Sequence, residues 1–177
     1  MKDSILLRPL KEKDAPLMLE WLKDPDISHN FRFNIEEITI DTVLEFIRNS
    51  QNMEVTKNLA IVNETDEYLG TVSLKNIDSK AKSAEYAIAL RKKAHGKRYG
   101  YWATVKILDE AFYTHGLERV YFNVLSDNIN AVRFYEKFGF IYEGEFLNHI
   151  FVHNRIHSLK WFRLMKSEYE RIMEMKI

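Results

Sequence analysis

A basic turn with two glycines stands near the middle of the chain and reads Arg91-Lys92-Lys93-Ala94-His95-Gly96-Lys97-Arg98-Tyr99-Gly100-Tyr101. An apolar, strand-like run from Ala84 to Leu90 precedes it, and a helix-periodic segment follows it. Free main-chain N–H groups and the positive end of a helix dipole should therefore point at whatever binds above the turn. Glycine lets the main chain approach a ligand closely, and five Arg and Lys side chains add mobile positive charge. The turn predicts a site for a phosphorylated ligand.

Composition limits the class of protein. The length of 177 residues suits one domain, and an apolar content of 46% with 13% aromatic residues indicates a packed globule. The formal net charge is zero, which argues against nucleic-acid or membrane-surface binding. The absence of cysteine excludes disulfides, thiolate metal sites and a thiol nucleophile on the protein. Since there is no apolar run of about 18 residues and no secretory leader at the start, we expect a cytoplasmic protein.

Hydrophobic periodicity and turn residues predict a mixed sheet. The expected strands are 5–9, 58–62, 68–74, 83–90, 119–125, 140–145 and 158–165. The expected helices are 15–22, one capped by Asp41, one from Gly96 or Lys97 that ends at Gly116, one from Asn128 to Phe138 that Gly139 closes, and 166–175. Residues 27–38 show no clean period and are predicted to form a loop. This order describes a mixed α/β sheet with helices on both faces, in one domain over residues 1–177.

A second motif follows a strand about 30 residues beyond the basic turn and reads Asn128-Ile129-Asn130-Ala131-Val132-Arg133-Phe134-Tyr135-Glu136-Lys137-Phe138-Gly139-Phe140. Its pattern resembles the second half of a GNAT acyltransferase, and the turn at Gly96 to Gly100 resembles the pyrophosphate loop of that superfamily. Element order is similar over essentially the whole chain. The opening Leu7-Arg8-Pro9-Leu10 and the run Tyr142-Glu143-Gly144-Glu145 look most like the branch that contains ribosomal-protein N-terminal, polyamine and amino-sugar acetyltransferases.

The resemblance implies a fold and a co-substrate. GNAT enzymes acetylate amines with acetyl-CoA on an α/β (α+β) fold, whose mostly antiparallel sheet of about seven strands splays between strands 4 and 5. No metal is implied. The coenzyme-binding residues that it implies are Ile88, Ala89, Leu90, His95, Gly96, Lys97, Arg98, Tyr99, Gly100, Tyr101 and Asn128.

The turn departs from the family signature where Arg98 replaces a glycine and His95 replaces Gln or Arg. We therefore expect ordinary backbone dihedral angles at Arg98. Its side chain must lie aside or pair with a phosphate, and the planar guanidinium favours the phosphate. Gly96 is expected to supply part of the flexibility that is lost.

Two residues are predicted to carry the chemistry. Glu85 shares a strand face with Ala87 and Ala89, and their small side chains leave room for a substrate beside the carboxylate. Glu85 is the expected general base, directly or through water, with a surface glutamate as the alternative. The resemblance implies that Tyr135 protonates the leaving CoA thiolate, with a core aromatic residue as the alternative. Asn128 can cap its helix, contact the pantetheine arm, or do both.

The acceptor pocket is harder to predict. Trp21 is a candidate that fits a core position better, and Phe31 and Arg32 are candidates in the aperiodic loop. His149 is a fourth, and histidines recur at positions 149, 153 and 157. That spacing would suit a metal only on a helix, whereas the neighbouring residues indicate a strand and a hairpin.

The predicted reaction is direct acetyl transfer from acetyl-CoA to a small primary amine, an amino-sugar nucleotide or a polyamine. The oxyanion is expected at a main-chain N–H near Ile88 or Ala89. A polyamine would favour carboxylates at the mouth of the site, which Asp24, Asp26, Glu36 and Glu37 could supply unless they form a solvated face. The alternatives are a protein N-terminal acetyltransferase of the ribosomal type and a non-catalytic CoA-binding module. The oligomeric state stays open, with a homodimer as one option.

Overall fold

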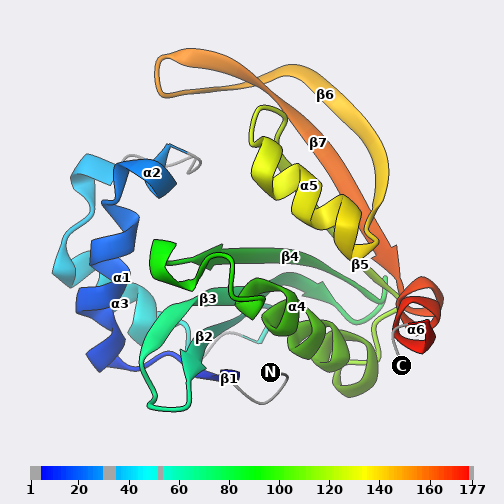
Figure 1. The fold of residues 1–177 in the computed structure, drawn as a ribbon, viewed down its shortest axis with the longest axis horizontal. Helices are drawn as coiled ribbons and strands as arrows, with labels where there is room; N and C mark the ends of the chain where they lie inside the picture. The colour runs from blue at the N-terminus through cyan, green and yellow to red at the C-terminus, as the bar shows by residue number, and fades with distance from the viewer. Residues whose placement is uncertain (1–4, 30–34, 52–53, 176–177) are drawn as a thin grey trace.

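The computed structural model describes residues 5–29, 35–51 and 54–175. Within these residues seven strands form one sheet in the order β1-β2-β3-β4-β5-β7-β6 (Figure 1). The strands are β1 (Ile5–Pro9), β2 (Lys57–Asn63), β3 (Tyr68–Asp78), β4 (Ser83–Leu90), β5 (Arg119–Leu125), β6 (Ile141–Val152) and β7 (Arg155–Met165). The α-helices are α1 (Ala15–Leu22), α2 (Pro25–Ser28), α3 (Ile40–Asn49), α4 (Tyr99–Asp109), α5 (Ile129–Phe138) and α6 (Lys166–Glu174). Short 3₁₀ turns lie at Glu12–Asp14, Ile35–Glu37 and Lys92–Ala94, and a π-helical turn extends α4 over Glu110–Thr114.

The sheet opens between β4 and β5. All other neighbouring strands pair antiparallel, whereas these two run parallel. Their register covers only the pairs from Ser83–Arg119 to Glu85–Tyr121. Beyond Glu85 the two strands diverge, and β5 continues the sheet through β7. The predicted mixed, mostly antiparallel sheet with a splay at this point is confirmed.

Helices cover both faces of the sheet, as predicted. One buried cluster joins side chains of β2, β3 and β4 to α4 and α5, and a second joins the opposite face of β2 and β3 to α1 and α3. Figure 1 shows α5 between β4 and β7. Ring contacts of Tyr135 with Tyr86 on β4 and Phe162 on β7 agree with this placement. Helix α5 therefore packs beside the gap that the splay creates.

Two helix starts differ from the prediction. Helix α4 begins at Tyr99, later than expected, because Gly96 (φ 74°) and Arg98 (φ 61°) both have left-handed backbone conformations that interrupt a helix. Helix α3 is capped by Thr39 and not by Asp41: the Thr39 hydroxyl accepts the N–H of residue 42 at 3.3 Å. Threonine is a good N-cap in itself, and Thr39 lies two residues before the predicted cap.

The last four elements, from α5 to α6, are joined by turns whose geometry is defined. Asn128 caps α5 by accepting the N–H of Ala131 at 3.2 Å, and Gly139 ends the helix with φ 117°. A side chain at Gly139 would meet the Cδ1 atom of Ile172 at 2.5 Å, so α6 packs tightly at this turn. Strands β6 and β7 are longer than predicted, because a tight turn at residues 153–154 lets them pair almost to its edge.

Four buried tyrosines make alkaline unfolding an expected property of this fold. Burial raises the pKa values of Tyr68, Tyr86, Tyr135 and Tyr169 above their ordinary value of about 10. The unfolded chain therefore loses these protons first as the pH rises. Each such tyrosine lowers the free energy of unfolding by about 1.4 kcal/mol per pH unit between its unfolded and its folded pKa.

We expect the urea midpoint, followed by circular dichroism, to stay level from pH 7 to about 9 and to fall steeply above about pH 10. The chain has nine tyrosines, and exposed ones such as Tyr113 and Tyr142 can ionise in the folded protein. The tyrosinate absorbance of the four buried rings should appear only together with the loss of helical signal. Ionisation of all nine tyrosines well before the helical signal changes would contradict this account.

Candidate active site

A cavity of about 840 Å³ lies where β4 and β5 diverge. It extends from the face of the sheet that α1 and α3 cover, through the gap between the two strands, to the inward face of α5. Its lining includes Met18, Trp21, Leu22, Glu37, Ile38, Thr42, Val43, Phe46, Asn58, Thr71, Ser73, Lys75, Phe122, Asn123, Val124, Leu125, Asn128, Ala131, Tyr135 and residues 85–89.

Glu85 lies on the cavity wall at the point where the splay begins. Its strand neighbours on the same face, Ala87 and Ala89, also line the cavity, so the predicted space beside the carboxylate is present. The Asn76 amide donates a hydrogen bond to Oε2 of Glu85 at 3.0 Å. The carboxylate is therefore held at the entrance to the gap, and it is not paired with a cation in the described part of the chain.

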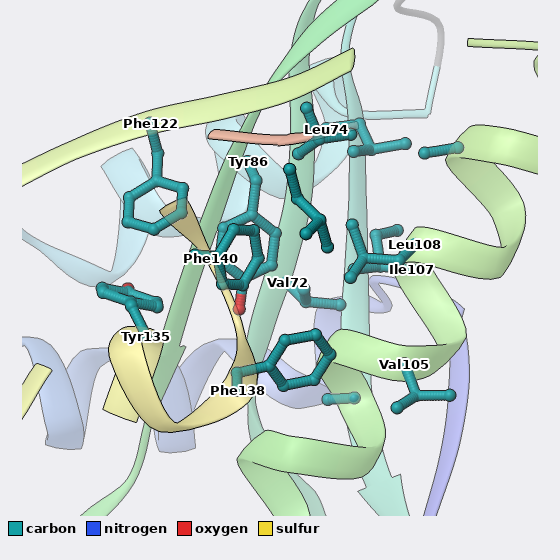
Figure 2. Close-up of a cluster of buried hydrophobic side chains, with 14 of the residues drawn as sticks. Val72, Leu74, Tyr86, Val105, Ile107, Leu108, Phe122, Tyr135, Phe138 and Phe140 are labelled. Carbon is teal, nitrogen blue, oxygen red and sulfur yellow. The ribbon is translucent and has the colours of Figure 1, made fainter. Parts of the chain in front are cut away.

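Tyr135 lies on the opposite wall, on the inward face of α5. Its ring packs against Phe122 at 4.2 Å between centroids and against Phe140 at 5.8 Å (Figure 2). Burial raises the pKa of the Tyr135 hydroxyl, and no hydrogen bond to this hydroxyl is present among the described residues. Tyr135 is thus both a core aromatic residue and a protonated hydroxyl at the cavity wall.

The main chain of β4 has one open side in the gap. Arg91 donates its N–H to the carbonyl of Leu69 on β3, and successive residues of a strand alternate in direction. By this alternation the N–H groups of Ile88 and Leu90 face the gap, whereas that of Ala89 faces β3. The Nε2 atom of His95 lies 3.2 Å from the carbonyl oxygen of Leu90, on the same open side.

The backbone expectation for Arg98 is wrong. The residue adopts φ 61° and ψ 9°, the left-handed conformation that a glycine would adopt readily. The guanidinium lies aside, over the rings of Tyr101 at 5.2 Å and Trp102 at 5.8 Å. The turn therefore keeps the glycine-like backbone, and the arginine side chain stacks on the first turn of α4.

Most of the mobile positive charge expected on the turn is already paired. Arg91 is buried and contacts Glu20 at 2.7 Å and Glu67 at 3.1 Å. Lys93 also pairs with Glu67, and Lys92 pairs with Asp26 on α2. Within the described ranges only Lys97 and Arg98 of the five cations lack a carboxylate partner.

The start of α4 nevertheless fits a phosphate. Trp102 is the first residue whose N–H bonds back into the helix, to the carbonyl of Arg98, and no side chain caps the helix before it. The N–H groups of the first turn therefore have no acceptor within the helix. Gly100 packs closely there, since an added Cβ would lie 3.1 Å from Cδ1 of Leu90. Together with Lys97 and Arg98 this helix start suits the diphosphate of a nucleotide.

The predicted acceptor residues lie in different places relative to the cavity. Trp21 is buried, lines the cavity and donates from Nε1 to the Tyr68 hydroxyl at 3.0 Å. Phe31 and Arg32 lie outside the described residues. His149 is exposed on β6, packs edge-on against Phe146 and does not line the cavity. The segment 149–157 forms two strands and a turn, not a helix.

The acidic residues predicted at the mouth are also only partly available. Asp24 caps α2 by accepting the N–H of Asp26 at 3.0 Å, and Asp26 pairs with Lys92. Glu37 lines the cavity. One of the four candidates therefore faces the site itself.

Sequence reasoning missed the polar floor of the cavity. Thr71, Ser73 and Lys75 line it from β3, and the Ser73 hydroxyl donates to Oδ1 of the buried Asn58 at 2.7 Å. The signal was present, because these polar residues alternate with apolar ones along a central strand. The prediction used that strand only as a hairpin partner.

No helix within the described residues combines the length and the apolar character that crossing a bilayer requires.

Comparison with known proteins agrees with this geometry. Residues 4–141 match the family model of the acetyltransferase (GNAT) domain. The spermidine N(1)-acetyltransferase of Vibrio cholerae serotype O1 is 23% identical over 169 residues, which are 96% of this chain and 97% of the relative. The uncharacterized N-acetyltransferase p20 of Bacillus licheniformis is 26% identical over 172 residues, 94% of this chain and 96% of the relative.

A solved structure shares the fold. The crystal structure of spermidine N-acetyltransferase from Vibrio cholerae in complex with CoA and spermine superposes with a TM-score of 0.86 at 22% identity, over 94% of this chain and 98% of the other. The family match, the splayed sheet and the uncapped start of α4 lead to one assignment. The chain belongs to the GNAT family and is an acetyl-CoA-dependent N-acetyltransferase.

Proposed function

We propose that this chain, as a single domain over residues 1–177, transfers an acetyl group from acetyl-CoA directly to a polyamine. The observation that carries the proposal is the cavity through the gap, which places Glu85 on one wall and Tyr135 on the other. An amine from the α1 and α3 side and a thioester from the α4 and α5 side can therefore meet in one space. A cytoplasmic location and a homodimer remain predictions.

The charge and shape of the cavity support a polyamine. Among its described charged lining residues, Glu37 and Glu85 outnumber Lys75. Apolar side chains of α1 and α3, such as Phe46, offer surface for methylene groups. The relatives named as spermidine acetyltransferases cover nearly the whole chain and support the same acceptor class.

We assign each step of the reaction to one group of the site. The first turn of α4 binds the diphosphate of CoA, with Lys97 and Arg98 beside it. Glu85 accepts a proton from the bound ammonium group, and this matters because neutralising an amine of pKa near 10.4 costs about 4.6 kcal/mol at pH 7. The N–H of Ile88 binds the thioester oxygen as negative charge develops. The neutral amine forms a bond to the thioester carbon, the C–S bond breaks, and Tyr135 donates a proton to the departing thiolate. The amide nitrogen then loses its extra proton, which restores the tyrosine hydroxyl.

The test is an acceptor screen with purified protein, in which a disulfide reagent detects CoA thiol release. The chain contains no cysteine, so the protein adds no background signal. We expect kcat/KM for spermidine and spermine to exceed that for an amino-sugar nucleotide or a ribosomal-protein N-terminal peptide by at least about tenfold. Turnover of the peptide alone would favour the N-terminal acetyltransferase. Tight CoA binding without release with any amine would indicate a non-catalytic module.

A further inference from the structure

The carboxylate of Glu85 is held asymmetrically. Its Oε2 atom accepts the hydrogen bond from Nδ2 of Asn76 at 3.0 Å. No hydrogen bond reaches Oε1 from any described residue, and Glu85 itself lines the cavity. Asn76 is exposed and stands outside the lining. One oxygen is therefore anchored from the solvent side, and the other is available to a substrate.

An irregularity in β3 brings Asn76 to this place. The register of β3 with β4 is regular from Gly70–Leu90 to Lys75–Glu85 and then shifts before Asp78. In an undisturbed pairing residue 76 would point to the face opposite Glu85. Here Asn76 adopts φ 49° within the bulge, which turns its amide back toward the carboxylate. Asparagine is among the few residues other than glycine that adopt this conformation readily.

The group that donates the hydrogen bond to Glu85 is a neutral amide. Lys75 lies directly across from Glu85 in the register, yet no ion pair joins them in the described part of the chain. A lysine ammonium in contact would stabilise the negative charge and weaken the carboxylate as a base. A neutral amide restrains the carboxylate's orientation with a smaller penalty on its basicity.

We infer that Asn76 is a positioning residue for acetyl transfer: through the bulge in β3 it fixes one oxygen of Glu85 so that the other faces the amine. The inference rests on the proposed role of Glu85 as the base. A proton acceptor is effective only when it is held within hydrogen-bond reach of the substrate, and a freely rotating glutamate side chain would not be.

The direct test replaces Asn76 in two ways. Asn76→Gly keeps the left-handed backbone and removes the amide, and we expect kcat with spermidine to fall about tenfold while KM for acetyl-CoA stays unchanged. Asn76→Asp replaces the donor with a like charge, so the acid limb of the kcat/KM profile should move to higher pH. The matched control is Asn154→Gly, which makes the same change at an exposed left-handed residue (φ 60°) in the β6–β7 turn and should leave kcat unchanged.

A double-mutant cycle separates this inference from the proposed function. In a Glu85→Gln background, Asn76→Gly should cause no further loss, because the group through which it acts is gone. The same tenfold loss in that background, or wild-type activity of Asn76→Gly beside an impaired Glu85→Gln variant, would overturn the positioning role alone. Wild-type activity of Glu85→Gln would instead overturn the base assignment on which the inference rests.

Discussion

Replacing Tyr135 by phenylalanine should lower kcat about 100-fold without weakening acetyl-CoA binding or the fold. The substitution removes only the hydroxyl, which makes no hydrogen bond to a described residue. The ring and its packing against Phe122 are kept. Because burial raises the pKa of Tyr135, the residue is protonated throughout the working range and available as an acid. The same low-polarity surroundings destabilise the departing thiolate, so its need for a proton rises in parallel.

The measurement is steady-state thiol release at saturating spermidine, with the KM for acetyl-CoA and the thermal midpoint recorded alongside. Tyr113→Phe is the matched control, since this tyrosine is 57% exposed in the turn after α4 and remote from the cavity. If Tyr135→Phe retained the wild-type kcat, the thiolate would be leaving without help from this hydroxyl. A raised KM with unchanged kcat would assign Tyr135 to binding instead.

Local sequence patterns were sufficient to predict several strands and helices of this fold. Strands 83–90 and 119–125 were predicted to the residue, because each is a short apolar run bounded by polar turns. Asn128 and Gly139 marked both ends of α5 through their capping chemistry. The splay between strands 4 and 5 was predicted from the family resemblance, because the sequence of neither strand indicates where the two diverge.

The sequence did not show which side chains contact the basic turn in the folded chain. The basic turn was predicted to carry five mobile cations, but Arg91, Lys92 and Lys93 pair with carboxylates more than 20 residues away in the chain. Arg98 was expected to have ordinary dihedral angles because its residue type favours them. The residue lies in the left-handed region instead, and its guanidinium stacks on two rings of α4 that are close only in the folded chain.

In the candidate site, too, local sequence predicted some residues, and others depend on contacts that only the folded chain makes. Strand alternation placed Glu85 on a face of small residues, and the cavity lies on that face. The role of Asn76 could not be read in this way, because a bulge reverses the direction that alternation assigns to residue 76. The hydrogen bond from Ser73 in the floor to Asn58 joins two strands whose register only the folded sheet defines.

Replacing Phe122 by alanine should cost about 3–5 kcal/mol of folding free energy and should also disturb catalysis. Phe122 is 3% exposed, and its ring contacts four aromatic neighbours: Tyr86, Tyr135, Phe140 and Phe162. Figure 2 shows its ring near those of Tyr86, Phe140 and Tyr135. Because it borders both the core and the cavity, its loss removes the nearest ring that restrains Tyr135.

Urea unfolding followed by circular dichroism measures the stability effect, and kcat at a temperature where the variant stays folded measures the effect on the site. Phe122→Leu keeps most of the volume and should lose roughly 1 kcal/mol. Phe146→Ala makes the same truncation at a half-exposed ring on β6 and should have little effect. A loss below about 1 kcal/mol for Phe122→Ala would mean that α5 collapses into the space left behind. In that case Tyr135 would move with α5, and kcat should fall even though stability is retained.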